Sequence, residues 1–325
     1  MVLQMLLFVG GLVVLIKGAD WLVSGASALA RKHRVSDLAI GLTIVAFGTS
    51  APELVVNSYA AWQGHQDIVF GNVIGSNNFN LFIVLGITGL IAPIAVQKST
   101  VWKEIPISLA AAVLLLFFCN EFFLNDQDIL SRVDGFILLV CFVSFIWYVY
   151  RQMKKNPELV MEIPATDAKV VMHMSRLNIW VMIVGGLAGL VIGGRLVVTS
   201  AVSMAEMFGV SQKIIGLTIV AMGTSLPELA TSLVAALKKN NDIAVGNIVG
   251  SNIFNILLIL SISSLVRPIP YNAVFNTDLL IFTGGTVLLF LAMFTGKRKK
   301  LDRWEAGILL AGFLSYSVFL IGNEV

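Results

Sequence analysis

Apolar stretches of about 20 residues, separated by short polar connections, dominate this sequence. A helix of that length crosses the hydrocarbon core of a bilayer, which is about 30 Å thick. Only 13% of the residues are charged, too few to cover a water-facing surface, since soluble domains carry about 25%. We therefore expect an all-α integral membrane protein with ten transmembrane helices, at residues 2–29, 36–61, 68–91, 105–124, 133–150, 177–205, 212–236, 243–265, 275–295 and 304–321.

The basic residues predict how these ten spans are oriented. If the N-terminus is external, 17 of the 22 lysines and arginines fall in the inner connections, 3 fall in the outer ones and the other two lie within spans. Cytoplasmic loops of membrane proteins are enriched in lysine and arginine. We therefore expect both termini to be external and the segment 151–176 to be cytoplasmic. The membrane is expected to be that of a prokaryotic cell.

The sequence contains an internal repeat with an offset of 175 residues. "GLTIVAFGTSAPEL" (41–54) matches "GLTIVAMGTSLPEL" (216–229) at 12 of 14 positions, and "DIVFGNVIGSNNFN" (67–80) matches "DIAVGNIVGSNIFN" (242–255) at 9 of 14. Each copy contains five spans, so the second copy enters the membrane in the opposite direction. This predicts two inverted five-helix repeats, residues 1–150 and 177–325, joined by a linker at 151–176. Secondary transporters use this arrangement and bind substrate near the bilayer midplane, between the repeats.

Each copy of the first motif places a proline and a glutamate inside an apolar run. Pro52 removes a backbone N–H and releases a carbonyl near Gly48, and such groups are costly in hydrocarbon unless protein, water or an ion satisfies them. Thr49 and Glu53 lie four residues apart, on one helical face. Hydroxyl, carbonyl and carboxylate oxygens around one point are typical of a site for a hard cation.

If the motif helices converge, the two repeats supply two carboxylates, two amides and several hydroxyls at one depth. No cysteine or histidine accompanies them, so Na⁺ and Ca²⁺ suit the predicted site better than zinc or copper. The candidate ligands are Thr49, Ser50, Glu53, Ser76 and Asn80 of the first repeat, and Thr224, Ser225, Glu228, Ser251 and Asn255 of the second.

Several of these residues have a structural interpretation as well. An ionisable residue at membrane depth is functional by default, and Glu53 and Glu228 occupy equivalent positions. Asn80 and Asn255 could instead bridge helices by hydrogen bonds. Asp20 follows Lys17 by three residues, which favours a local ion pair. Close helix packing accounts for the repeated glycines equally as well as a functional role would. These glycines are Gly41, Gly48, Gly71, Gly75 and their repeat mates.

At these motifs the chain resembles the cation/calcium exchanger superfamily, in its sodium/calcium exchanger branch. The residues that carry the resemblance are "GTSAPEL" with "GNVIGSNNFN" and "GTSLPEL" with "GNIVGSNIFN". The resemblance covers all ten spans and implies that the long first and sixth helices slide across a core of the second, third, seventh and eighth. It implies Na⁺/Ca²⁺ antiport by alternating access, with the ten ligands above and the backbone carbonyls of Ala46 and Ala221. Some prokaryotic relatives carry aspartate where this chain has Asn255.

Alternative functions use the same residues differently. A K⁺-dependent exchanger would transport a third cation, and a Ca²⁺/H⁺ antiporter would use the glutamates as proton carriers. A cation channel would need a continuous pore. An enzyme is not expected, because the sequence has no nucleophile–base pair and no histidine cluster at metal-ligand spacing. The sequence indicates no organic cofactor, nucleic-acid partner or obligate protein partner; the expected partners are the bilayer and the transported ions.

Overall fold

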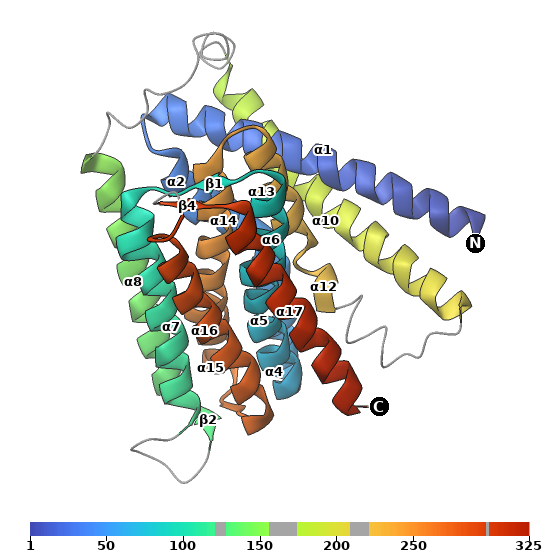
Figure 1. Cartoon of the computed structure of the whole chain (residues 1–325), viewed down its shortest axis with the longest axis vertical. Coiled ribbons are helices and arrows are strands. Elements are labelled where there is room, and N and C mark those ends of the chain that lie inside the picture. Colours follow the sequence, from blue (N-terminus) through green and yellow to red (C-terminus); the bar gives the residue numbers. More distant parts are fainter. Residues whose placement is uncertain (121–127, 156–173, 209–220, 297–298, 325) are drawn as a thin grey trace. The chain divides into compact units, whose positions relative to one another are not determined.

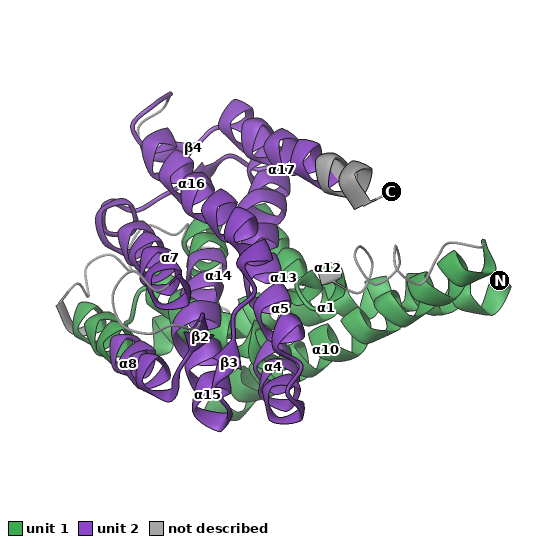
Figure 2. Ribbon diagram, turned by 90° about the horizontal axis from the view of Figure 1, so that it is seen from below, with its two compact units in different colours: residues 1–52, 144–247 green, residues 53–143, 248–325 purple. Residues whose placement is uncertain are grey.

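The computed structural model describes residues 1–120, 128–155, 174–208, 221–296 and 299–324. These residues are mainly helical (Figure 1) and pack into two compact units (Figure 2). Unit 1 contains residues 1–52 and 144–247, and unit 2 contains residues 53–143 and 248–325. Packing defines these units, whereas sequence similarity defines the repeats, so the division into 1–150, 151–176 and 177–325 stays a prediction. Most of the predicted linker lies outside the described residues.

Seven helical spans in the described residues are long and apolar enough to cross a membrane. They match the predicted first, third, fourth, fifth, sixth, eighth and ninth spans, although the fourth begins five residues earlier than expected, at Thr100 rather than 105. These helices fit the prediction of an all-α membrane protein. The seven are Val2–His33, Gln66–Ile91, Thr100–Cys119, Arg132–Met153, Arg176–Met207, Asn241–Val266 and Ala273–Ala292.

The other three predicted spans have different outcomes. The second is a bent pair, Asp37–Thr49 and Ala51–Gln63, with an angle of 48° between its parts. The seventh is described only from residue 221 and ends in helix α13, Leu226–Leu237. The tenth is helix α17, Arg303–Glu324.

Unit 1 is built around two long helices, α1 (Val2–His33) and α10 (Arg176–Met207), which lie side by side (Figure 1). Glycines let their backbones approach closely. A Cβ atom on Gly18 would lie 2.7 Å from the Leu190 nitrogen, and one on Gly186 would lie 2.6 Å from the Leu22 nitrogen. Small residues commonly permit such contact between membrane helices. The other elements of unit 1 are α2 (Asp37–Ile40), the π-helical segment η1 (Gly41–Val45), α3 (Ala46–Thr49), α12 (Ala221–Gly223), α13, and parts of α4, α8 and α14.

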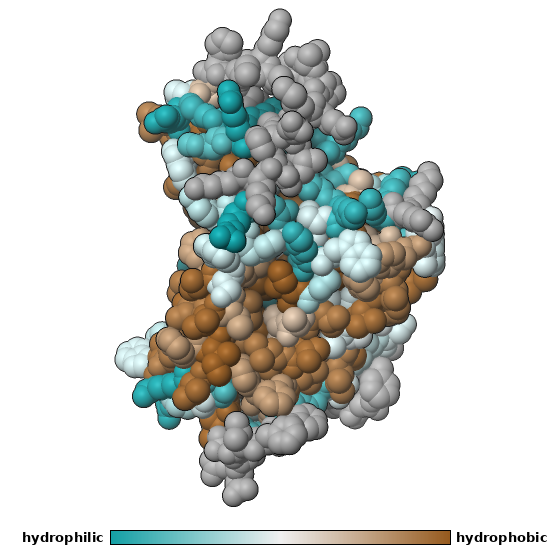
Figure 3. Space-filling view, turned by 90° about the vertical axis from the view of Figure 1, so that its left-hand side faces the viewer, coloured by the Kyte–Doolittle hydropathy of each residue, from teal (hydrophilic) through white to brown (hydrophobic). Residues whose placement is uncertain are grey.

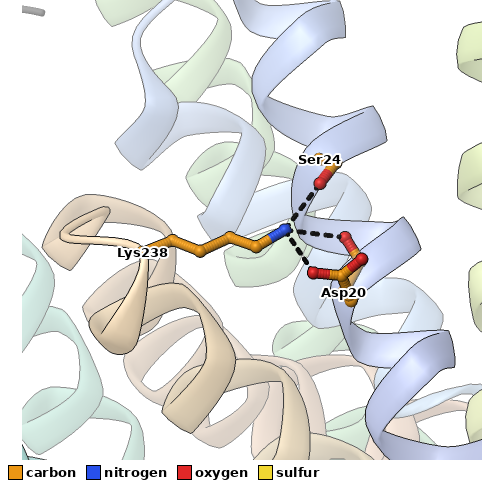
Figure 4. Close-up of polar contacts among 3 residues, drawn as sticks. All are labelled: Asp20, Ser24 and Lys238. Carbon is orange, nitrogen blue, oxygen red and sulfur yellow. Dashed lines mark hydrogen bonds and ion pairs between the residues drawn. The ribbon is translucent and has the colours of Figure 1, made fainter. Parts of the chain in front are cut away.

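The predicted ion pair between Asp20 and Lys17 is wrong. Asp20 instead pairs with Lys238, which follows α13, at 2.7 Å. The Lys238 ammonium also donates to Ser24 Oγ at 2.7 Å and to the Asp20 carbonyl at 3.2 Å (Figure 4). Sequence proximity suggested the wrong partner because the fold brings the end of α13 to the face of α1 that carries Asp20 and Ser24.

Unit 2 contains the remaining helices and two short antiparallel ribbons, which the all-α prediction did not include. In one ribbon Ile94 pairs with Leu301, and in the other Leu130 pairs with Ile269. The strands are β1 (Ile94–Ala95), β2 (Ile129–Leu130), β3 (Ile269–Pro270) and β4 (Lys300–Leu301). The helices and helical segments are α4 (Ala51–Gln63), α5 (Gln66–Asn78), η2 (Phe79–Val84), α6 (Leu85–Ile91), η3 (Thr100–Glu104), α7 (Ile105–Cys119), α8 (Arg132–Lys155), α14 (Asn241–Phe254), η6 (Asn255–Ile259), α15 (Leu260–Val266), η7 (Ala273–Phe275), α16 (Asn276–Ala292) and α17.

Large apolar side chains lie on the outside of the helices. On the face shown in Figure 3, hydrophobic side chains form a wide area, with hydrophilic ones above it. Helix α8 exposes Val133, Phe136, Val143 and Trp147. In a soluble protein a large exposed apolar surface marks an interface; here it is what a lipid-facing helix requires, because contact with the acyl chains keeps it out of water.

Candidate cation-binding site

Both copies of the Ser-x-Pro-Glu motif interrupt a helix at the serine. Ser50 has φ −85° and ψ 3°, and its repeat mate Ser225 has φ −90° and ψ 5°. The proline then occupies the second residue of the next helix, where its missing N–H costs no intrahelical hydrogen bond. The glutamate follows at the third residue, near the positive end of the helix dipole, which favours an anion. The motif therefore starts a new helix with a carboxylate in its first turn.

Glu228 is the predicted ligand whose surroundings in unit 1 are best defined. The residue is 1% exposed, and the Ser50 hydroxyl donates to its Oε1 at 3.2 Å. The Glu228 Oε2 and Ser225 Oγ atoms are buried and have no hydrogen-bond partner among the described residues. Buried polar atoms in proteins are normally hydrogen-bonded, so these two oxygens are available to a ligand.

A buried amide, Asn247, connects the backbone of Glu228 to Thr49. Its Nδ2 donates to the Glu228 carbonyl at 3.3 Å and to Ser232 Oγ at 2.9 Å. Its Oδ1 accepts from Thr49 Oγ1 at 3.0 Å. The Thr49 hydroxyl also lies 3.3 Å from the carbonyl oxygen of Ala46. The structure thus brings Ala46, Thr49, Ser50 and Glu228 into one hydrogen-bonded cluster within unit 1.

In unit 2, Glu53 lies in the first turn of α4. The residue is 1% exposed, and its backbone carbonyl accepts from Asn57 Nδ2 at 2.7 Å. The Asn57 Oδ1 is buried without a hydrogen-bond partner among the described residues. Asn57 and Ser232 are repeat mates, one turn after Glu53 and Glu228, so a polar side chain follows each glutamate on its own face.

Asn80 and Asn255 lie at the start of matching π-helical segments, η2 and η6, in unit 2. Such segments are rare and frequently occur at functional sites. The Asn255 Nδ2 donates to Asn77 Oδ1 at 2.9 Å, and Asn77 Nδ2 donates to the Asn252 carbonyl at 3.4 Å. The helix-bridging interpretation of Asn255 is therefore confirmed for its nitrogen. The buried Oδ1 atoms of Asn80 and Asn255 have no hydrogen-bond partner among the described residues, which leaves them available as ligands.

The remaining predicted ligands also lie in described parts of the chain. In unit 2, Ser76 Oγ lies 3.5 Å from Asn72 Oδ1, and Ser251 Oγ is buried without a partner among the described residues. In unit 1, Thr224 is half-buried before Glu228, and Ala221 begins α12. The predicted set thus divides between the two units, and a single site of twelve residues stays a prediction.

Sequence reasoning missed several residues of these networks, among them Asn247, Asn77 and Asn57. The first two carry the same signal as the predicted ligands, because Asn72 with Asn247 and Asn77 with Asn252 are identical pairs of the repeat. The glycine interpretation is supported in part. A Cβ atom on Gly246 would lie 3.0 Å from Gly41 Cα, whereas one on Gly75 would meet nothing within 4 Å.

The donor atoms of both networks are carboxylate, amide and hydroxyl oxygens. The described residues contain no cluster of three or more histidine, cysteine, aspartate or glutamate side chains that could hold a metal ion. Hard cations such as Na⁺ and Ca²⁺ prefer oxygen ligands. The chemistry of the donors therefore fits these cations.

Comparison with known proteins identifies the family. The family model described as sodium/calcium exchanger protein matches residues 3–151 and 178–322, which include both copies of both motifs. The chain belongs to the sodium/calcium exchanger family.

Several relatives match this exchanger over nearly their full length. The chain is 40% identical to the putative antiporter CaxA of Alkalimonas amylolytica, over 96% of this chain and 97% of that protein. It is 30% identical to the sodium/calcium exchanger MaX1 of Methanosarcina acetivorans, over 95% and 96%. A solved structure of the sodium-calcium exchanger NCX_Mj superposes with a TM-score of 0.81 at 32% identity, covering 98% of each chain.

Proposed function

We propose that this chain is a secondary antiporter that exchanges Na⁺ for Ca²⁺ across a membrane by alternating access. The observation that carries the proposal is the Glu228 carboxylate, which is buried among apolar helices. Its Oε2, like the Ser225 Oγ, has no hydrogen-bond partner among the described residues. Family membership and the relative named as a sodium/calcium exchanger support the same two ions.

The proposed site contains all twelve predicted residues, with Glu53 and Glu228 as its two charges. With both ionised, the site carries −2, which one Ca²⁺ or two Na⁺ balance. A bare pair of carboxylates would resist movement past apolar walls at a cost of several kcal/mol each. Only a loaded carrier would switch easily, and this requirement couples the two ions. With three Na⁺ for each Ca²⁺, one net charge would move, equivalent to about 2.3 kcal/mol per 100 mV.

We further propose that ten helices form two inverted five-helix repeats in a prokaryotic cell membrane, with both termini external. Support comes from the 175-residue offset and the charge bias. It also comes from the matching helix interruptions at Ser50 and Ser225 and from the matching positions of η2 and η6.

Flux measurements in lipid vesicles test the exchange. The purified chain is reconstituted into Na⁺-loaded vesicles, which are diluted into Na⁺-free medium containing Ca²⁺. We expect Ca²⁺ uptake that depends on the Na⁺ gradient and is absent from protein-free vesicles and from vesicles loaded with choline. Ca²⁺ uptake driven by an H⁺ gradient alone, or uptake that requires K⁺, would contradict the proposal. Internal Ca²⁺ should accelerate the uptake of labelled Ca²⁺ into a carrier, whereas a channel would show no such acceleration.

A further inference from the structure

The geometry points to Asn247 as a positioning residue that keeps two proposed cation ligands, Thr49 Oγ1 and the Ala46 carbonyl, available to the transported ion. This inference rests on the proposed function and adds a residue outside the predicted ligand set. Asn247 is fully buried (0% exposed), so its amide makes no hydrogen bonds to bulk water.

The partners of Asn247 determine which way its amide faces. The atom 3.3 Å from the Glu228 carbonyl must be the nitrogen, because a carbonyl oxygen accepts and does not donate. Its second N–H reaches Ser232 Oγ at 2.9 Å. Both N–H groups of Asn247 therefore donate to residues of α13. The Oδ1 atom then faces Thr49 Oγ1, at 3.0 Å. Because Oδ1 only accepts, the Thr49 hydroxyl must supply the proton for this contact.

A threonine hydroxyl has one proton and two lone pairs. When the proton of Thr49 is directed to Asn247, the hydroxyl lone pairs and the Ala46 carbonyl are left for a cation. Without Asn247, the Thr49 proton can turn to the Ala46 carbonyl, at 3.3 Å, or to the Glu228 carboxylate, with which Thr49 also interacts. In either case Thr49 would donate to another proposed ligand, and one ligand would occupy another.

Two further observations support a specific role. Gly246 directly precedes Asn247, and a Cβ atom there would lie 2.9 Å from the Leu38 carbonyl, so glycine permits the close approach that brings Asn247 to Thr49. In unit 2 the repeat mate, Asn72, has its Oδ1 3.5 Å from Ser76 Oγ. Each of the two mates therefore faces the hydroxyl of a proposed ligand.

A double-mutant cycle between Asn247 and Thr49 tests the inference. Ion affinity is measured from the dependence of thermal unfolding on Ca²⁺ and Na⁺ concentration, for the parent, Asn247→Ala, Thr49→Val and the double variant. We expect Asn247→Ala to weaken Ca²⁺ affinity about tenfold in the parent and less than about twofold in the Thr49→Val background, because its effect is transmitted through Thr49. If Asn247→Ala does not fold, Asn247→Leu, which has a similar shape but no polar atoms, replaces it in the cycle.

The matched control is Asn276→Ala, which removes a different asparagine that exchanges two hydrogen bonds with Asn120, at 2.6 and 2.8 Å, and contacts no proposed ligand. It should lower the ion-free unfolding temperature without changing ion affinity. Parental affinity in Asn247→Ala, or equal weakening in both backgrounds, would overturn the inference. A parent that neither Ca²⁺ nor Na⁺ stabilises would instead overturn the proposed function itself.

Discussion

At the scale of single residues, the two motif glutamates carry the proposed chemistry. Each is 1% exposed and lies in the first turn of a helix, after a serine at which the preceding helix is interrupted. A carboxylate in that setting needs a positive partner, and a transported cation supplies one only while it is bound. The difference between the bound and empty states is what makes such a residue useful for coupling ions.

Replacing either glutamate by glutamine should abolish exchange. Glu228→Gln keeps the size of the side chain and an oxygen that can accept from Ser50, but it removes one of the two proposed charges. We expect Na⁺-driven Ca²⁺ uptake into vesicles to fall at least about tenfold, equivalent to about 1.4 kcal/mol, and the same for Glu53→Gln. Uptake at half the parental rate or more in either variant would remove that glutamate from the site.

A substitution at Asn255 tests the charge of the proposed site by adding a carboxylate rather than removing one. In the proposed site, the two glutamates would oppose ionisation of a third carboxylate, so the Asn255→Asp variant should show a cation response that is steeper with pH than that of the parent. The variable to measure is ion-dependent thermal stabilisation between pH 5 and 9. Asn255→Ala loses both the bond to Asn77 and the free oxygen. A Na⁺ and Ca²⁺ response that is unchanged in both variants at every pH would leave Asn255 a helix bridge only.

At the scale of helices, the contact between α1 and α10 depends on glycine. A Cβ atom on Gly18 would lie 2.7 Å from the Leu190 nitrogen and 2.8 Å from the Gly186 carbonyl, whereas one on Gly10 of the same helix would meet nothing within 4 Å. Backbone cannot move aside as a flexible side chain can, so extra volume must separate the helices.

Gly18→Ala should therefore destabilise the protein by about 1–3 kcal/mol. Gly10→Ala is the matched control and should be neutral or stabilising by up to about 1 kcal/mol, because alanine is the better helix former. Thermal unfolding of both variants in the same detergent provides the comparison. Equal unfolding temperatures for the two variants would show that the close approach of α1 and α10 contributes nothing to stability.

At the scale of the whole molecule, the proposed orientation can be tested by labelling. Cys119 and Cys141 are first replaced by alanine, and single cysteines are then introduced by Lys155→Cys, Lys299→Cys and Asn272→Cys. With the positive-inside orientation, a membrane-impermeant thiol reagent added to sealed cells should label only the Asn272 variant, whose position is exposed in a predicted external connection. Labelling of the Lys155 or Lys299 variants in intact cells would reverse the orientation.

The sequence alone was sufficient for the features that depend on local composition and on its own repetition. The apolar stretches predicted the seven spans found in the described residues, because a helix that crosses the hydrocarbon core must be apolar over about 20 residues. The two Ser-x-Pro-Glu phrases identified where helices are interrupted, since proline acts on its immediate neighbours.

Contacts between distant residues were decided only by tertiary structure. Asp20 pairs with Lys238 rather than with Lys17, and Asn247 reaches Thr49, 198 positions away in the sequence. The helix-bridging role of Asn255 and its proposed role as a ligand also became separable only in the tertiary structure. Its nitrogen contacts Asn77, whereas its oxygen has no hydrogen-bond partner among the described residues. A hydrogen bond requires two atoms within about 3 Å, and that distance depends on how helices pack, which neither hydropathy nor motif spacing encodes.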